Sequence, residues 1–432
     1  MTSGDTFSWS LLPSQRFAVI HDFSCGRELV ATRDFQPGDL ILRETPLLIF
    51  GDRKELVKLL GRLSSVEKEE LFDMQGLSAP TQASHMSCRT LMERLWTEAE
   101  VFHQLFYGEI SDKLVSVSID DIFRVLSIAH LNAHSFHPTE QEPDRAAIFP
   151  VSAKIAHSCL PNSTYTVTDD GLEYYAVSFI KRGAPITASY LDSDALVSSV
   201  EKRRNLLARS KDFFCLCVKC RRASDLASGL KCRSHRCSGT SYFCNNSTTI
   251  GGIASWRCST CGSRTEPVVK TLHSIEREYN ALQDCDDVDE FIDKLSCLIE
   301  ASRPDLSRAH YLLTEMQLEL STVHLAVAHA WVDRADAEAQ VAEHRRTAID
   351  ILEDVTARIE CVDDDSDACG CRQSTRCEKS HPPSLTAAFL VYRALCSVLR
   401  MKAAVPGWIS RYRSLLVILY GIENGNVAAL TG

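Results

Sequence analysis

The sequence predicts an α+β protein: a β-rich domain with a helical insertion, a cysteine-rich region and an all-helical C-terminal part. Three observations support this prediction. Short β-rich runs bounded by glycine and proline turns occupy 16–50 and return at 147–190. Between these segments, and again after about residue 270, apolar residues recur every three or four positions, as in amphipathic helices. Cysteines at CxC and CxxC spacing lie between the second β-rich segment and the last helices.

Composition limits the class of protein. The 432 residues suffice for two or three domains, and 45% hydrophobic with 24% charged residues is ordinary for globular proteins. A net charge of -10 argues against a broad nucleic-acid footprint, so direct nucleic-acid binding is not expected and any such contact would have to be local. We find no secretory signal and no apolar run of 18 residues, and therefore expect an intracellular, soluble protein, cytoplasmic or nuclear, without a membrane contact.

The first β-rich segment reads FAVIHD, then Gly26, then ELVATRDFQPGDLILRETPLLIF. A turn at Pro37-Gly38 separates its β-rich runs, which is a hairpin pattern. The following segment, 51–130, contains helical stretches such as KELVKLLGRL and RTLMERLW. After about 270, apolar residues step by three and four through two further segments, from Leu313 to Val327 and from Ala348 to Ile359.

Eighteen cysteines in a reducing compartment favour metal ligation over disulfides. The motif CLCVKC supplies three thiols, which need a fourth ligand to complete a tetrahedral zinc site. A second zinc site is predicted from two pairs, in which Cys244 is an alternative to Cys237; the pairs are Cys232 with Cys237, and Cys258 with Cys261. A third group lies in an acidic loop, where a disordered insertion is the preferred interpretation; it comprises Cys369, Cys371, Cys377 and His381.

Three motifs together resemble the catalytic end of a SET domain: AHSCLPN at 156–162, ITASYLD at 186–192 and FFCLCVKC at 213–220. Their order is similar to that of SMYD proteins, in particular the SmydA-type arthropod branch. The segment 51–130 offers only His85, Cys88 and His103 as zinc ligands, so we expect no MYND finger. The resemblance implies five parts: the N-terminal SET segment 11–50, the insertion 51–130, the SET core 131–195, a post-SET and second zinc region 196–265, and a TPR-like helical domain 266–432.

The resemblance also implies chemistry. Cys159 would be the fourth ligand of the first zinc site, with Cys215, Cys217 and Cys220. S-adenosylmethionine (AdoMet) would supply a methyl group to a protein lysine, whose amine the hydroxyl of Tyr190 would orient. Asn162 is expected to lock the motif structurally. The other positions expected at the cofactor are Gly26, Arg27, Glu28, Asn132, Ala156, His157 and Phe213.

Three positions depart from the family pattern. Glu28 stands where a second glycine is usual, and Ala156 replaces an asparagine whose amide hydrogen bonds are worth on the order of 1 kcal/mol each. The tyrosine usual before the cysteines is replaced by Lys211 or, in the alternative, by Phe213. A cation at Lys211 would repel a sulfonium and a substrate ammonium unless it points away. These changes leave two main hypotheses: a protein-lysine methyltransferase, or a weakened or inactive SET scaffold that binds protein partners through its helical C-terminal domain. A third, nucleic-acid binding near KCRSHRC, is disfavoured by the acidic balance.

Overall fold

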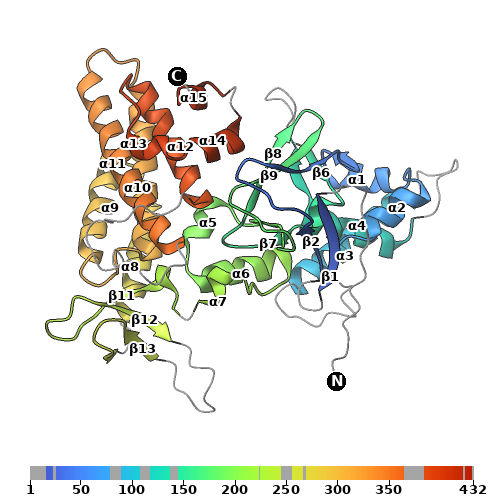
Figure 1. Ribbon diagram of the computed structural model, residues 1–432, viewed down its shortest axis with the longest axis horizontal. Coiled ribbons are helices and arrows are strands. Elements are labelled where there is room, and N and C mark those ends of the chain that lie inside the picture. Colours follow the sequence, from blue (N-terminus) through green and yellow to red (C-terminus); the bar gives the residue numbers. More distant parts are fainter. Residues whose placement is uncertain are drawn as a thin grey trace. The chain divides into compact units, whose positions relative to one another are not determined.

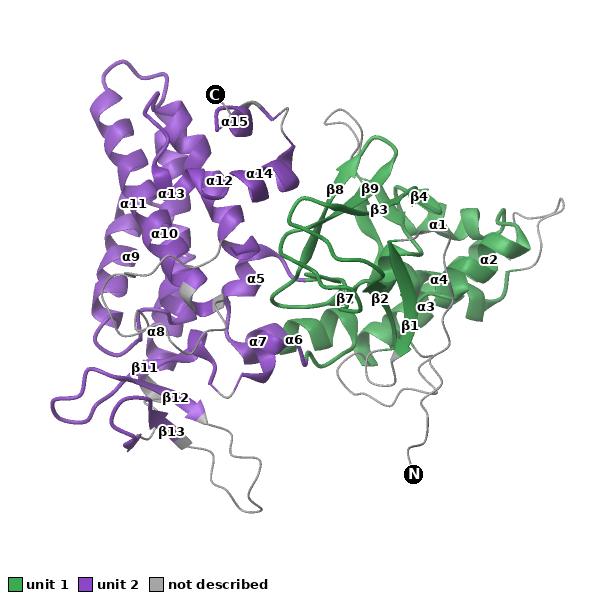
Figure 2. Ribbon diagram, in the orientation of Figure 1, with its two compact units in different colours: residues 1–190, 204–215 green, residues 191–203, 216–432 purple. Residues whose placement is uncertain are grey.

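The computed structural model describes residues 16–22, 26–77, 89–107, 117–136, 145–222, 224–244, 255–265, 269–363, 384–421 and 424–430. The chain divides into two compact units, shown in green and purple in Figure 2. Unit 1 comprises residues 1–190 and 204–215, and unit 2 comprises 191–203 and 216–432. Within the described part of the chain, no helix combines the length and the apolar character that crossing a membrane requires.

Unit 1 contains four small sheets, with strand orders β1-β2, β3-β9-β8, β4-β6-β5 and β7-β10 (Figure 1). Their bounds are β1 (Phe17–Asp22), β2 (Gly26–Ala31), β3 (Leu40–Glu44), β4 (Leu48–Phe50), β5 (His134–Phe136), β6 (Arg145–Ile148), β7 (Ala156–His157), β8 (Ser163–Thr168), β9 (Gly171–Ala176) and β10 (Thr187–Ala188). Alternate residues of β1, β2 and β9 pack into one core together with Phe35, Phe149 and Ile155 from the connecting segments.

The hairpin predicted at the Pro37-Gly38 turn is not formed. β1 and β2 pair antiparallel, from Phe17 opposite Ala31 to Asp22 opposite Gly26. The Pro37-Gly38 turn, in contrast, does not join paired strands, because β3 pairs with the distant β9. The hydrogen bond from Gly38 N to the Ala176 carbonyl, at 2.8 Å, fastens this turn to the end of β9.

β7 and β10 form a parallel pair that brings two distant motifs together. The side-chain amide of Asn162 bridges the same two segments: it donates to the Pro185 carbonyl at 2.9 Å and accepts from Thr187 N at 2.8 Å. Ser163 adds a bond from its hydroxyl to the Thr187 carbonyl at 2.9 Å. Asn162 therefore has the structural role expected of it, since its donors and acceptor tie the two segments of the chain together.

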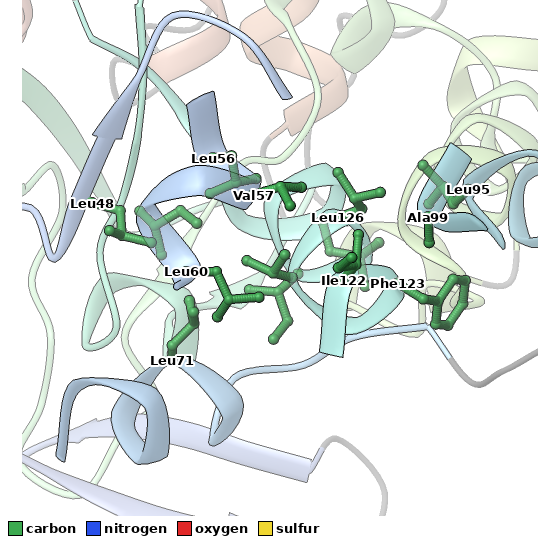
Figure 3. Close-up of a cluster of buried hydrophobic side chains, with 14 of the residues drawn as sticks. Leu48, Leu56, Val57, Leu60, Leu71, Leu95, Ala99, Ile122, Phe123 and Leu126 are labelled. Atoms are coloured by element: carbon green, nitrogen blue, oxygen red, sulfur yellow. The ribbon is translucent and has the colours of Figure 1, made fainter. Parts of the chain in front are cut away.

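The insertion is helical, as predicted: α1 (Arg53–Leu60), α2 (Ser65–Phe72), α3 (Arg89–Tyr107) and α4 (Ile119–Asn132). Asp52 and Ser64 cap α1 and α2 through side-chain bonds to backbone N–H groups. Figure 3 shows how Leu56, Leu60 and Leu95 meet Leu126 in one apolar cluster. The expectation that no MYND finger is present remains a prediction, because His85 and Cys88 lie outside the described residues.

Unit 2 is mainly helical, with a small sheet. Its sheet has the order β11-β12-β13-β14 and the bounds β11 (Leu230–Lys231), β12 (Thr240–Cys244), β13 (Ser255–Cys258) and β14 (Arg264–Thr265). The helices are α5 (Ser193–Val197), α7 (Val218–Arg221), α8 (Val269–Leu282), α9 (Val288–Ser302), α10 (Tyr311–Ala330), α11 (Glu338–Asp363), α12 (Leu385–Arg400), α13 (Gly407–Ser410), α14 (Arg413–Tyr420) and α15 (Gly425–Ala428). The remaining helix, α6 (Val200–Lys211), has residues in both units.

The helical periodicity predicted after residue 270 is confirmed. Leu313 and Met316 on α10 are almost fully buried, and so are Ala348 and Leu352 on α11. α8 and α9 pack on the same core through Ile275 and other apolar residues. Figure 1 shows α9, α10 and α11 as long neighbouring helices. Burial of one apolar stripe per helix accounts for this arrangement.

Candidate functional site

Four thiols gather at the first predicted zinc site. The sulfur atoms of Cys159, Cys215, Cys217 and Cys220 all lie within 4.8 Å of one another. Three of these cysteines are buried and Cys217 is half-buried. The chemistry of the set fits Zn²⁺, which prefers four tetrahedral thiolates in structural sites.

Hydrogen-bond donors surround these sulfur atoms. His157 Nε2 lies 3.3 Å from Cys159 Sγ, and Arg203 Nη2 donates to Cys220 Sγ at 3.6 Å. His157 Nδ1 accepts the backbone N–H of Tyr190, so in the neutral ring Nε2 carries the proton and donates to Cys159. Arg203 is fully buried, although it is charged. Such donors stabilise thiolates and orient ligands, and they support the assignment of a metal site.

The second cluster consists of Cys232, Cys237, Cys258 and Cys261. Two of its sulfur–sulfur distances, Cys232 to Cys261 and Cys237 to Cys258, are 3.7 Å. A tetrahedron with Zn–S bonds of about 2.3 Å requires about 3.8 Å. Backbone N–H groups donate at 3.4 Å to the sulfurs of Cys232, Cys237 and Cys258. The structure thus places Cys237 in the cluster, as in the first of the two alternatives, and both predicted four-cysteine sites are compatible with zinc.

Gly239 shows why the second cluster is so compact. A Cβ atom at this position would lie 2.4 Å from Thr260 Oγ1 and 2.7 Å from Cys258 Sγ. Only glycine permits this close approach of the backbone to a ligand. The third candidate group, Cys369, Cys371, Cys377 and His381, lies outside the described residues.

Hydrogen bonds hold both the backbone and the hydroxyl of Tyr190. Its backbone N–H donates to His157 Nδ1 at 3.0 Å, and its hydroxyl donates to the Ile155 carbonyl at 2.6 Å. The ring of Phe213 lies 6.2 Å from that of Tyr190 and 5.9 Å from that of His157. Although 40% of Tyr190 is exposed, its bonded hydroxyl end is desolvated, and burial raises the pKa of Tyr190 to about 12. The phenol is therefore neutral at physiological pH and has a defined orientation.

Lys211, at the end of α6, lies beside Tyr190. Its Nζ atom is 5.7 Å from the centre of the Tyr190 ring and donates to the Leu131 carbonyl at 2.5 Å. Desolvation lowers the pKa of Lys211. Burial, with a further contribution from Lys211, lowers the pKa of His134 to about 4. The ammonium group of Lys211 therefore lies over the ring of Tyr190, which itself packs beside the rings of His157 and Phe213.

The remaining expected cofactor positions lie on three elements. Gly26 begins β2 with a φ of +79°, which glycine adopts without strain, and a Cβ there would meet nothing within 4 Å. Arg27 forms a salt bridge with Asp73, and Glu28 is half-buried. Asn132 ends α4, where its side-chain N–H₂ donates to two backbone carbonyls at 2.8 Å. Ala156, on β7, directly precedes His157.

One supporting residue was not predicted to be functional. Glu44, at the end of β3, accepts three hydrogen bonds of 2.6–2.7 Å from Val151 N, Ser152 N and Ser152 Oγ. These bonds fix the short turn that leads to Ile155, whose carbonyl accepts the Tyr190 hydroxyl. Burial raises the pKa of Glu44. The sequence does contain a signal for Glu44, because it is an acidic residue within the largely apolar run LILRETPLL.

Comparisons with known proteins agree with this geometry. The SET domain family model matches residues 26–191. Residues 26–191 thus match a SET domain, and the chain is similar to proteins of the SMYD group. Relatives include the Drosophila melanogaster SET domain-containing protein SmydA-8, isoform B (31% identical over 119 residues, 27% of this chain and 25% of the relative). The human N-lysine methyltransferase SMYD2 is 27% identical over 186 residues, 41% of each chain.

A third relative is the Arabidopsis thaliana histone-lysine N-methyltransferase ASHR1, 27% identical over 157 residues, which are 33% of this chain and 32% of that one. The chain thus spans about a quarter to two fifths of the length of these three relatives. A solved structure, the SET domain of LSMT bound to lysine and AdoHcy, covers 82% of this SET-domain protein and 87% of its own chain at 14% identity. Its TM-score of 0.31 is too low to support a conclusion. Membership of the SmydA-type branch remains a prediction.

Proposed function

We propose that this SET-domain protein is an AdoMet-dependent protein-lysine N-methyltransferase. The observation that carries the proposal is the fixed, neutral hydroxyl of Tyr190, which donates to the Ile155 carbonyl. Tyr190 lies two residues after β10, and its backbone N–H donates to His157. Positioning of an amine against an electrophilic methyl group supplies most of the rate in such a transfer. The methyltransferase names of SMYD2 and ASHR1 support the reaction class.

The proposed role of Tyr190 is to orient the amine. With a pKa of about 12, its phenol is protonated at physiological pH and does not act as a general base. Its oxygen can accept a hydrogen bond from the substrate amine while its own O–H continues to donate to the Ile155 carbonyl. Because free lysine has a pKa near 10.4, the substrate must lose a proton to solvent before transfer.

We propose that the cofactor is held by the turn at Gly26, Arg27 and Glu28, by Ala156 and His157 on β7, and by Asn132 and Phe213. When bound, AdoMet supplies the methyl group as an electrophile. The open space at Gly26 and the aromatic face of Phe213 suit a methionine backbone and an adenine ring, respectively. The substrate would be a protein or peptide with a target lysine.

A second candidate function is favoured by the position of Lys211, whose ammonium lies 5.7 Å from the Tyr190 ring. A positive charge beside Tyr190 opposes both a sulfonium and a substrate ammonium. In this alternative, the protein is a weakened or inactive scaffold that binds protein partners through its helical C-terminal domain. The two functions differ in whether the cofactor binds.

Titration of the zinc-loaded chain with AdoMet distinguishes them. Binding at or below millimolar concentration, followed by methyl transfer to a lysine-containing peptide library, supports the enzyme. A chain that keeps two zinc ions but shows no binding at millimolar AdoMet would refute the methyltransferase proposal and leave the scaffold. Binding without transfer to any peptide would support a regulatory use of the pocket instead of catalysis.

A further inference from the structure

The small sheet of unit 2 concentrates positive charge. The segment from Leu230 to Thr265 contains five lysines and arginines and no aspartate or glutamate. Since the whole chain carries -10, the rest of it carries -15. Four thiolates on a zinc dication would contribute -2, so the zinc-loaded segment still has a net charge of +3. A cationic zinc-binding sheet in an acidic protein is a local electrostatic feature that whole-chain composition conceals.

Strand register puts three of these cations on one face. Arg257 of β13 lies directly opposite Arg264 of β14 and, on its other side, Tyr242 of β12. Lys231 of β11 pairs with Thr240, two residues from Tyr242 and therefore on the same face. Together, Lys231, Arg257 and Arg264 form what we call the cationic row. All three side chains are exposed.

The cationic row has no internal compensation. Arg233, nearby, is bonded to Asp305 at 2.7 Å. Across the described ranges of the chain, in contrast, no carboxylate forms a salt bridge with Lys231, Arg257 or Arg264. Like charges directly opposite each other on adjacent strands destabilise a sheet. The Arg257–Arg264 pair therefore costs stability in the free protein, and an anionic partner would relieve that cost.

We propose that the cationic row binds the phosphate backbone of a nucleic acid. Two guanidinium groups side by side match phosphate oxygens, because arginine presents a planar fork of donors. A row of exposed cations on a sheet fits a regular series of phosphates and needs no base-specific contact. This site is separate from Tyr190 and does not depend on methyl transfer.

The test uses the full zinc-loaded chain and fluorescence anisotropy with a labelled 20-base-pair DNA duplex and a 20-nucleotide single-stranded RNA, at 50, 100 and 200 mM salt. Three phosphate contacts predict that log K falls with log salt with a slope of about -2.7 on the duplex. Replacement of both arginines, Arg257→Gln with Arg264→Gln, should weaken binding at 50 mM salt by about tenfold or more. It should also reduce the slope by about 1.8.

A matched control removes two exposed cations elsewhere in unit 2, Lys294→Gln with Arg303→Gln, and should leave affinity and slope nearly unchanged. The charge-preserving pair Arg257→Lys with Arg264→Lys should keep the slope, and zinc content of two per chain shows that each variant is folded. Absence of binding to both nucleic acids at 50 mM salt overturns the proposal. Equal losses of nucleic-acid affinity in the glutamine variant and in the control variant overturn it too. Binding to polyglutamate that is as tight as binding to DNA also overturns it, because it would indicate an acidic protein partner.

Discussion

Lys211 offers the sharpest test of how the candidate methyl-transfer site works. Its Nζ atom lies 5.7 Å from the centre of the Tyr190 ring. The proposed function places a positively charged ligand group beside the same ring. Two unit charges about 6 Å apart repel by about 0.7 kcal/mol in water and by about 3 kcal/mol at the effective dielectric constant of a protein surface. Replacement of Lys211 by methionine removes this repulsion while it retains most of the side-chain volume.

The expected result is an AdoMet affinity higher by about 3-fold to 100-fold. AdoHcy is the matched ligand, because it lacks the sulfonium charge and should gain little. Lys211→Arg keeps a cation at the same place and is the matched variant. Calorimetric titration of the native chain and both variants with both ligands gives the ratio of the two affinities, which cancels any general change in the pocket.

The reasoning is refuted if Lys211→Met leaves the ratio of AdoMet to AdoHcy affinity unchanged. An equal gain for both ligands would mean that Lys211 acts by occupying space instead of by its charge. The pH dependence gives a second check. Because desolvation lowers the pKa of Lys211, a rise in pH should neutralise it earlier than an exposed lysine, and AdoMet affinity should rise with pH in the native chain but not in Lys211→Met.

Three further predictions concern the rest of the molecule. Tyr190→Phe should lower methyl transfer by about 100-fold or more while cofactor affinity, measured by calorimetry, stays the same; unchanged turnover would mean that another group orients the amine. Cys159→Ser and Cys258→Ser should each reduce the zinc content from two ions to one by metal analysis, and loss of both ions from either variant would contradict independent sites. Burial lowers the pKa of His310 to about 3, so the unfolded state takes up its proton first and stability falls as pH drops below about 6.5. This loss should reach about 3 kcal/mol at pH 4.5 in denaturant titrations and should disappear in His310→Asn, which can still cap α10; equal acid sensitivity of the two proteins would exclude His310 as the cause.

Much of the architecture follows from local sequence patterns. The cysteine spacings predicted metal clusters and the family resemblance supplied Cys159 as the fourth ligand of the first one. Both four-cysteine groups gather as expected, in an arrangement that suits tetrahedral zinc. The periodic helices of the insertion and of unit 2 also followed from the sequence, since an apolar stripe must be buried whatever its partner is. The wrong hairpin at Pro37-Gly38 shows the limit of this reasoning: turn residues identify a bend, but they do not say which strand pairs with the next one.

The sequence by itself determined the family motifs, seven of the eight cysteines of the two clusters and the three departures at Glu28, Ala156 and Lys211, whereas the structure placed Cys237 in the second cluster. Only the tertiary structure decided that Lys211 lies beside Tyr190, which depends on packing between α6 and α4. It also decided that Arg257 and Arg264 stand side by side, although the chain is acidic. The physical reason is the same in both cases. The strength of an electrostatic interaction depends on the distance between the two charged or polar groups. For residues far apart in the sequence, strand register and helix packing set that distance.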